Sequence, residues 1–134
     1  MTRKLLLDTG VAADYVFRRN DVYSRARSEV AKGHKIGICL PVLGELFAGV
    51  EYSASRERNL QRLVDQISDF AEWPFDRAAA EEYGRLFAHL RRVGRPMQQI
   101  DIQIAAVALT LRHCTLATRD SDFNPIPGLT IESW

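Results

Sequence analysis

Acidic side chains stand at four points of the sequence where predicted elements begin or end. They are Asp8, Glu45, Asp101 and the neighbouring pair Asp120 and Asp122. Three of these points follow an apolar run that predicts a buried strand, and Asp101 opens a helix that is apolar on nearly every side. Ligands of parallel α/β sheets bind beyond the carboxyl ends of the strands. We therefore expect four or five carboxylates to converge on one cleft, provided that the helix of Asp101 starts on the same side of the sheet.

Carboxylates brought that close repel one another, and one of them takes up a proton unless a cation intervenes. Hard divalent cations accept oxygen ligands, and Mg²⁺ needs only a few carboxylates because it keeps several of its waters. Such an ion activates water and neutralises charge on a phosphate. A convergent all-carboxylate cleft therefore predicts metal-dependent phosphoryl chemistry rather than redox chemistry or acyl transfer.

Each acidic residue also has a purely structural interpretation. Asp8 could cap the turn that follows it, and Asp101 could be the N-cap of its helix. Asp120 and Asp122 are residue types that loops favour. The combination, and not any single member, carries the prediction of a metal site.

Glu45 is the member that is hardest to explain structurally. It lies between Leu43 and the pair Leu46-Phe47, in the predicted apolar face of a helix that begins near Pro41. A carboxylate in such a face needs a cation or several hydrogen-bond donors. We therefore expect Glu45 to be buried and to point into the cleft.

The apolar runs predict which elements position these residues. Strands are predicted at 4–8, 35–40, 114–118 and 129–131, and helices at 11–17, 21–32, from 41, through 60–70, at 76–93 and at 102–111. Continuous apolar strands alternating with helices are typical of sheets covered on both faces. The expected fold is a three-layer α/β/α domain with a central, mainly parallel sheet, and the length suits a single domain over residues 1–134.

The composition is that of an ordinary globular protein. Apolar residues make up 46% and charged residues 26%, which argues against disorder, collagen and coiled coil. The formal charge of +1 provides no global field for nucleic acid, although only three of the eighteen basic residues are lysines and arginine suits phosphate better. No apolar run approaches the roughly 20 residues that span a bilayer. We expect a cytoplasmic protein that does not associate with membranes.

Four segments, in order, resemble the four acidic motifs of PIN-domain ribonucleases. They are Leu6-Leu7-Asp8-Thr9, Leu43-x-Glu45-Leu46, Asp101-x-x-Ile104-Ala105-Ala106 and Ala117-Thr118-Arg119-Asp120-Ser121-Asp122-Phe123. The tail at 126–134 resembles the VapC branch of that family, the toxin half of VapBC toxin–antitoxin pairs. The likeness extends over nearly the whole chain.

The resemblance implies a PIN-like domain whose acidic pocket binds Mg²⁺ or Mn²⁺ and cleaves RNA endonucleolytically with a metal-activated water. It implies a homodimer and inhibition by a small VapB-like antitoxin. Matching motifs assign Asp8, Glu45, Asp101 and Asp120 as the catalytic and metal-binding residues. Asp122 is an alternative fourth ligand, or else the cap of the short turn at Phe123.

Further residues have supporting roles by the same resemblance. Thr118 and Thr9 are expected to hold the carboxylates in place without binding the ion. Members of the family often carry Asn or Ser two positions after the first Asp, where this chain has Gly10. Independently of the resemblance, Arg119 and Arg95 fall in loops that could border the cleft and hold RNA phosphates, or else they are solvated loop charges.

Two other functions remain open at this point. A PIN-like binding module that has lost catalysis would keep its carboxylates for a structural metal or for a partner's arginine. A phosphatase would use Asp8 as its nucleophile, but that chemistry often needs an Asp at position 10 and a later lysine. The chain has Gly10 and no lysine after Lys35.

Overall fold

The computed structural model describes residues 2–134 and contains a five-stranded parallel sheet. The strands are β1 (Lys4–Leu7), β2 (Lys35–Cys39), β3 (Ala71–Trp73), β4 (Cys114–Ala117) and β5 (Ile131–Glu132). Their spatial order is β3-β2-β1-β4-β5, and every neighbouring pair is parallel. The predicted α/β fold with a central parallel sheet is confirmed.

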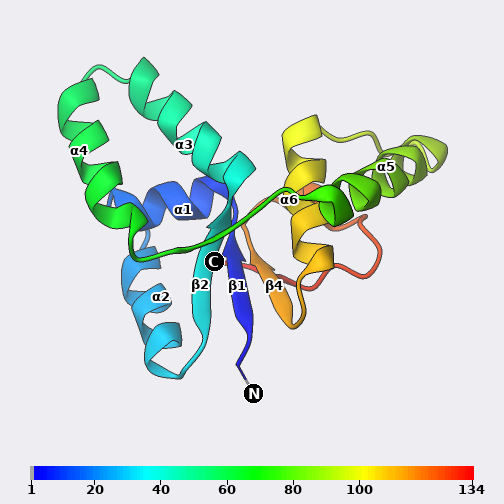
Figure 1. The fold of residues 1–134 in the computed structure, drawn as a ribbon, viewed down its shortest axis with the longest axis horizontal. Helices are drawn as coiled ribbons and strands as arrows, with labels where there is room; N and C mark the ends of the chain where they lie inside the picture. The colour runs from blue at the N-terminus through cyan, green and yellow to red at the C-terminus, as the bar shows by residue number, and fades with distance from the viewer. Residues whose placement is uncertain (1) are drawn as a thin grey trace.

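Six α-helices surround the sheet. They are α1 (Thr9–Val16), α2 (Val22–Ala31), α3 (Leu40–Tyr52), α4 (Arg56–Ile67), α5 (Arg77–Arg92) and α6 (Gln99–Thr110). Figure 1 shows α1, α2 and α4 to one side of the strands and α5 and α6 to the other. Helix α3 contacts α1 and α4 as well as α6, so it joins the two groups near the carboxyl ends of the strands.

The central strand explains where the first acidic residue lies. Leu5, Leu6 and Leu7 of β1 are fully buried, as expected for a strand that is covered on both faces and flanked by parallel neighbours. The strand ends where the backbone N–H of Asp8 donates to the carbonyl of Ala117, the last residue of β4. Asp8 therefore stands at the carboxyl end of the strand in the middle of the sheet.

The third strand was not among the four strands predicted from the sequence. Residues 71–73 pair with β2 at the edge of the sheet. The pairing is close because a Cβ on Gly37 would lie only 2.6 Å from the carbonyl oxygen of Ala71 and 2.7 Å from the Trp73 ring. A three-residue edge strand leaves little periodic pattern, so the sequence alone did not reveal it.

Two element boundaries near the acidic residues also differ from the predictions. Helix α1, predicted to begin at residue 11, begins at Thr9 because Asp8 caps it, so Gly10 is its second residue. Helix α6 begins at Gln99 with Gln98 as its N-cap, so Asp101 lies within the first turn and is not the N-cap. The last strand spans 131–132 rather than 129–131.

Two smaller features complete the fold. Over residues 2–134, none of the helices has both the length and the apolar character required to cross a bilayer.

Cys39 is buried and Cys114 is half-buried, and both are free thiols.

Candidate active site

A pocket of about 380 Å³ opens at the carboxyl ends of β1 and β4. Four carboxylates from four separate stretches of chain line it: Asp8, Glu45, Asp101 and Asp120. They come from the end of β1, from α3, from the first turn of α6 and from the loop after β4. Within the part of the chain that the structure describes, Arg119 is the one basic residue in the lining.

Asp8 is the most enclosed of the four carboxylates, with 9% of the residue exposed. Its Oδ1 accepts the backbone N–H of Val11 at 2.8 Å and so caps α1, while its Oδ2 accepts the hydroxyl of Thr118. Burial raises the pKa of Asp8, although the hydrogen bonds from Thr118 and Val11 oppose the rise. The structural interpretation and the functional one therefore both hold for this residue, because one side chain caps a helix and faces the pocket.

Thr118 connects Asp8 to Asp120. Its hydroxyl donates to Asp8 and accepts the backbone N–H of Asp120 at 3.0 Å. Asp120 in turn accepts the backbone N–H of Asp122 at 2.9 Å and caps the short 3₁₀ helix Ser121–Phe123. The cap of that turn is thus Asp120, and the idea that Asp122 caps it is wrong.

The two candidates for the fourth acidic position lie in different surroundings. Asp120 lines the acidic pocket. Asp122 instead borders a separate hollow of about 220 Å³ together with Arg95. Arg95 accordingly does not line the acidic pocket, whereas Arg119 does.

Glu45 reaches the pocket from α3, but its environment differs from the prediction. The residue is exposed rather than buried, because Val42, Leu46 and Val50 form the buried face of the helix while Glu45 lies beside them at the rim. Thr9 donates its hydroxyl to Oε1 of Glu45 at 2.6 Å. Helices α1 and α3 are therefore linked directly at the edge of the pocket.

The pKa of Asp101 is affected by the charges of the other acidic groups. Burial, together with the negative charges of Asp120, Glu45 and Asp8, raises its pKa to about 6. Such a shift arises where carboxylates are gathered without a cation to neutralise them. Perturbed carboxylates in a cleft are typical of functional sites.

The donor set fits a hydrated hard cation. All four candidate ligands are carboxylates, the donors that Mg²⁺ and Mn²⁺ accept. Among residues 2–134, no three His, Cys, Asp or Glu side chains are close enough to ligate one ion directly. Mg²⁺ is bound through one or two carboxylates and several waters, so the pocket suits that mode better than a closed protein cage.

Gly10 also lines the pocket. A Cβ at this position would lie 3.8 Å from Oδ1 of Asp8, which is ordinary van der Waals distance. The space for a small side chain is present, and the glycine leaves it open.

The sequence did not single out the partners of Arg119. Arg119 binds Asp14 of α1 and the main-chain carbonyl of Trp134. A charged residue in the otherwise apolar stretch of α1 was the available signal for Asp14, since such a residue needs a partner when it is buried. For the carbonyl of Trp134 the sequence carried no signal, because any residue could provide it.

Comparison with known protein families matches residues 5–129 to the PIN domain. The chain therefore belongs to the PIN domain family. It is 30% identical over 131 residues to the "tRNA(fMet)-specific endonuclease VapC" of Shigella flexneri, with 98% of each chain covered. It is also 30% identical over 130 residues to "Ribonuclease VapC2" of Rickettsia felis, with 96% of each chain covered.

Solved structures of VapBC complexes share the fold. The VapBC2 complex of Rickettsia felis, solved on a fragment of promoter DNA, contains a chain that superposes with a TM-score of 0.89 at 29% identity, covering 98% of both chains. The DNA-bound VapBC complex of Salmonella typhimurium gives a TM-score of 0.88 at 30% identity, covering 99% of both chains. The family identified from the four acidic motifs is confirmed.

Proposed function

We propose that this chain is a metal-dependent endoribonuclease and the toxin of a type II toxin–antitoxin pair. The observation that carries the proposal is the convergence of four carboxylates from distant stretches on one pocket, where burial and their mutual repulsion raise the pKa of Asp101 to about 6. PIN-domain relatives that match over the whole chain are named ribonucleases and VapC endonucleases.

Asp8, Asp101 and Asp120 hold a divalent cation, Mg²⁺ or Mn²⁺, directly or through water. When bound, the cation supplies Lewis acidity to a water and to the scissile phosphate. Glu45 is a further ligand or orients the attacking water, because its position at the exposed rim leaves an oxygen free while Thr9 holds the other. Asp120 is preferred over Asp122 as the fourth acidic residue because it lines the pocket.

The hydrogen bonds around Asp8 favour a nuclease over a phosphatase. Both carboxylate oxygens of Asp8 are already engaged, one by Val11 and the other by Thr118. Each oxygen keeps one lone pair that can face a cation, whereas the two hydrogen bonds lower the nucleophilicity that an attack on phosphorus would need. Asp8 is therefore better suited to hold a cation at a fixed position than to form a phospho-aspartate.

The partners of this chain follow from the same proposal. A VapB-like antitoxin binds it, since its structural neighbours come from VapBC complexes. The substrate is RNA, the toxin forms a homodimer, and the pair acts in the cytoplasm. None of these assignments requires a membrane-spanning segment.

The test is cleavage of total RNA by the purified chain with Mg²⁺ or Mn²⁺, with and without a chelator. We expect cleavage that the chelator abolishes and that Asp8→Asn and Asp101→Asn each lower by orders of magnitude. Full activity in both variants would falsify the assignment of the site. Binding of Mn²⁺ without any cleavage would favour a catalytically inactive binding module, and a trapped phospho-aspartate would favour a phosphatase.

A further inference from the structure

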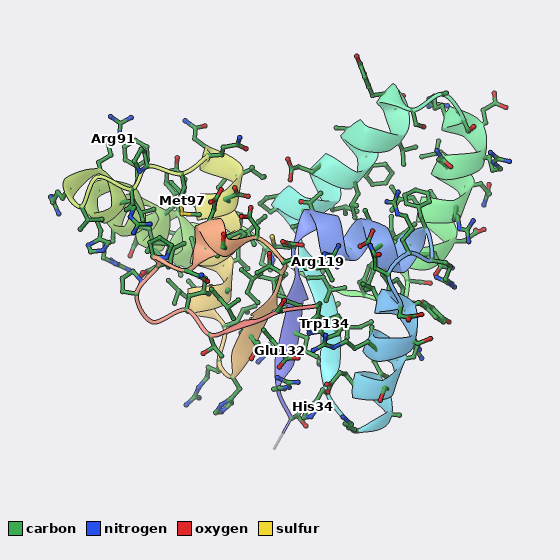
Figure 2. The ribbon with its side chains drawn as sticks, turned by 180° about the vertical axis from the view of Figure 1, so that it is seen from behind. His34, Arg91, Met97, Arg119, Glu132 and Trp134 are labelled. Atoms are coloured by element: carbon green, nitrogen blue, oxygen red, sulfur yellow. The ribbon has the colours of Figure 1, made fainter. Side chains whose placement is uncertain are left out.

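Arg119 lies at the centre of a set of contacts that the proposed chemistry does not use. It follows Thr118 and precedes Asp120, so it sits between two residues of the pocket. Its Nη1 donates to the main-chain carbonyl of Trp134 at 2.6 Å, and its Nη2 donates to Oδ2 of Asp14. Figure 2 shows Arg119 where the strands meet α1, with Trp134 close by.

Asp14 is a strong anchor for this guanidinium. Only 5% of the residue is exposed, and it lies on α1, the helix that Asp8 begins. Besides Arg119, it accepts hydrogen bonds from Arg19 at 3.2 Å and from Asn20 at 2.9 Å. Burial alone would raise the pKa of Asp14, but the hydrogen bonds of Asn20 and Arg119 outweigh it and lower the pKa below its ordinary value. A buried charge with this many donors is held in one geometry.

Trp134 is a second anchor that is itself held in place. The residue is 8% exposed, its indole N–H donates to Glu132 at 2.9 Å, and the guanidinium of Arg25 stacks 4.7 Å from its ring centroid. Glu132 belongs to β5, and its carbonyl accepts the backbone N–H of Thr118 at 3.1 Å. The loop that carries Asp120 is therefore fastened to β5 on one side and to α1 on the other.

These contacts matter because the carboxylates of the pocket repel one another and would otherwise move the strand ends apart. Asp8 and Asp120 lie at the carboxyl ends of neighbouring strands, and the charge of Asp120 contributes to the raised pKa of Asp8. The hydroxyl of Thr118 is a single link between them. Arg119 adds a second link, from the residue next to Asp120 to the helix that starts at Asp8.

We propose that Arg119 is a positioning residue, which holds the ends of β1, β4 and β5 together through Asp14 and Trp134 so that Asp8 and Asp120 face one ion. The inference rests on the proposed nuclease function and assigns Arg119 a role other than binding RNA phosphate. Each terminal nitrogen uses one of its two N–H groups within the protein, so these two contacts hold the guanidinium in place and leave only its remaining N–H groups for RNA.

A double-mutant cycle on Arg119→Gln and Asp14→Asn separates the two roles. If Arg119 acts through Asp14, each variant lowers kcat about tenfold and weakens Mn²⁺ binding several-fold, and the double variant is no worse than either single one. The KM for a short RNA stays within about twofold of the wild-type value. Mn²⁺ affinity is measured by calorimetry, so this readout does not require cleavage.

Two controls accompany the cycle. Arg19→Ala removes another arginine from the same carboxylate without touching the loop after β4, so it leaves kcat and Mn²⁺ affinity unchanged. Arg119→Lys keeps the charge and can replace only one of the two contacts, so it recovers part of the lost affinity. A thermal melt with its midpoint well above the assay temperature verifies that each variant is folded during the assay. If Arg119→Gln is not folded, Arg119→Lys takes its place in the cycle.

Three results would overturn the proposal. A raised KM with unchanged kcat in Arg119→Gln, not matched by Asp14→Asn, would make Arg119 a phosphate contact. Additive effects of the two substitutions would show that Arg119 does not act through Asp14. Unchanged Mn²⁺ affinity in both variants would show that neither residue positions the ion site. A wild-type chain that neither binds Mn²⁺ nor cleaves RNA would instead overturn the proposed function, and this inference with it.

Discussion

Two groups of carboxylates lie close together in this molecule and behave in opposite ways. In the pocket, burial and neighbouring negative charges raise the pKa values of Asp8 and Asp101. Beside it, Asp14 and Glu132 have lowered pKa values, because hydrogen bonds from Asn20 and Arg119 to the former and from Arg3 to the latter outweigh burial. Asp8 and Asp14 are only six residues apart: Asp8 is the N-cap of α1, and Asp14 lies within that helix.

The difference lies in the cations that the fold provides. Four arginines contact the second group: Arg3 and Arg25 bind Glu132, and Arg19 and Arg119 bind Asp14. In the pocket, the one basic side chain of the described residues is Arg119, and its contacts are with Asp14 and Trp134. The chain thus neutralises Asp14 and Glu132 with its own arginines, whereas the pocket carboxylates are the ones that we propose hold a divalent ion.

The largest predicted effect separates two neighbouring carboxylates of the last acidic motif. Asp120→Asn lowers metal-dependent RNA cleavage roughly 10²-fold or more, because a pocket carboxylate is lost while the amide oxygen still accepts the N–H of Asp122. Asp122→Asn, outside the pocket, is the matched control and changes cleavage by less than about threefold. Equal losses in both variants would show that the pocket does not define the fourth acidic position.

A smaller effect is expected where Thr9 holds Glu45. Thr9→Val keeps the shape of the side chain but removes the hydroxyl that donates to Glu45 at 2.6 Å. Loss of one hydrogen bond to a charged group corresponds to about tenfold in rate, so kcat falls by about that factor. The measurement is steady-state cleavage of a short RNA, and an unchanged kcat would mean that Glu45 does not depend on Thr9.

The side-chain network around Glu132 is expected to affect stability and not chemistry, because Arg119 contacts the main-chain carbonyl of Trp134 and not the side chain of Glu132. Glu132→Gln removes the charge that pairs with Arg3 and Arg25 and weakens the bond from the indole of Trp134. We expect the free energy of unfolding to fall by about 1–2 kcal/mol, between the values for exposed and buried ion pairs. Denaturant unfolding measures this, and the same variant keeps the Mn²⁺ affinity of the wild type within about threefold.

The smallest effect is a difference in how stability depends on pH. Asp101 has an ordinary pKa of 3.8 when unfolded and about 6 when folded, so its favourable contribution is complete below pH 3.8 and is lost as the pH rises to about 6. Metal-free Asp101→Asn lacks this loss and gains roughly 2–4 °C in Tm over the wild type between pH 4 and pH 7. Identical pH profiles for the two chains would show that the pKa of Asp101 is not raised in the folded chain.

The sequence predicted the elements with strong apolar runs and missed those without them. The buried leucines of β1 and the nearly all-apolar sequence of α6 identified these elements directly. Strand β3 lies at the sheet edge and is three residues long, and its place depends on contact with Gly37, which no local pattern encodes. The start of α1 at Thr9 was missed because the side chain of Asp8 caps the helix while the residue still ends the strand.

The acidic pocket was predictable because each of its acidic residues lies at the end of a recognisable strand or in the first turns of a recognisable helix. Burial was not predictable in the same way: Glu45 was expected inside an apolar face, but it lies at the exposed rim beside Leu46. The role of Arg119 was beyond reach for a further reason. Its partners, Asp14 and Trp134, lie far away in the sequence, and only the folded chain brings them together.

The most direct test of the contrast between the two groups is a calorimetric titration of Mn²⁺ onto the chain after chelator treatment, in the wild type, Asp101→Asn and Glu132→Gln. We expect the wild type and Glu132→Gln to bind Mn²⁺ with similar affinity and Asp101→Asn to bind it at least about tenfold more weakly. The absence of binding by the wild type, or undiminished binding by Asp101→Asn, would contradict the conclusion that the pocket carboxylates are left for a divalent ion.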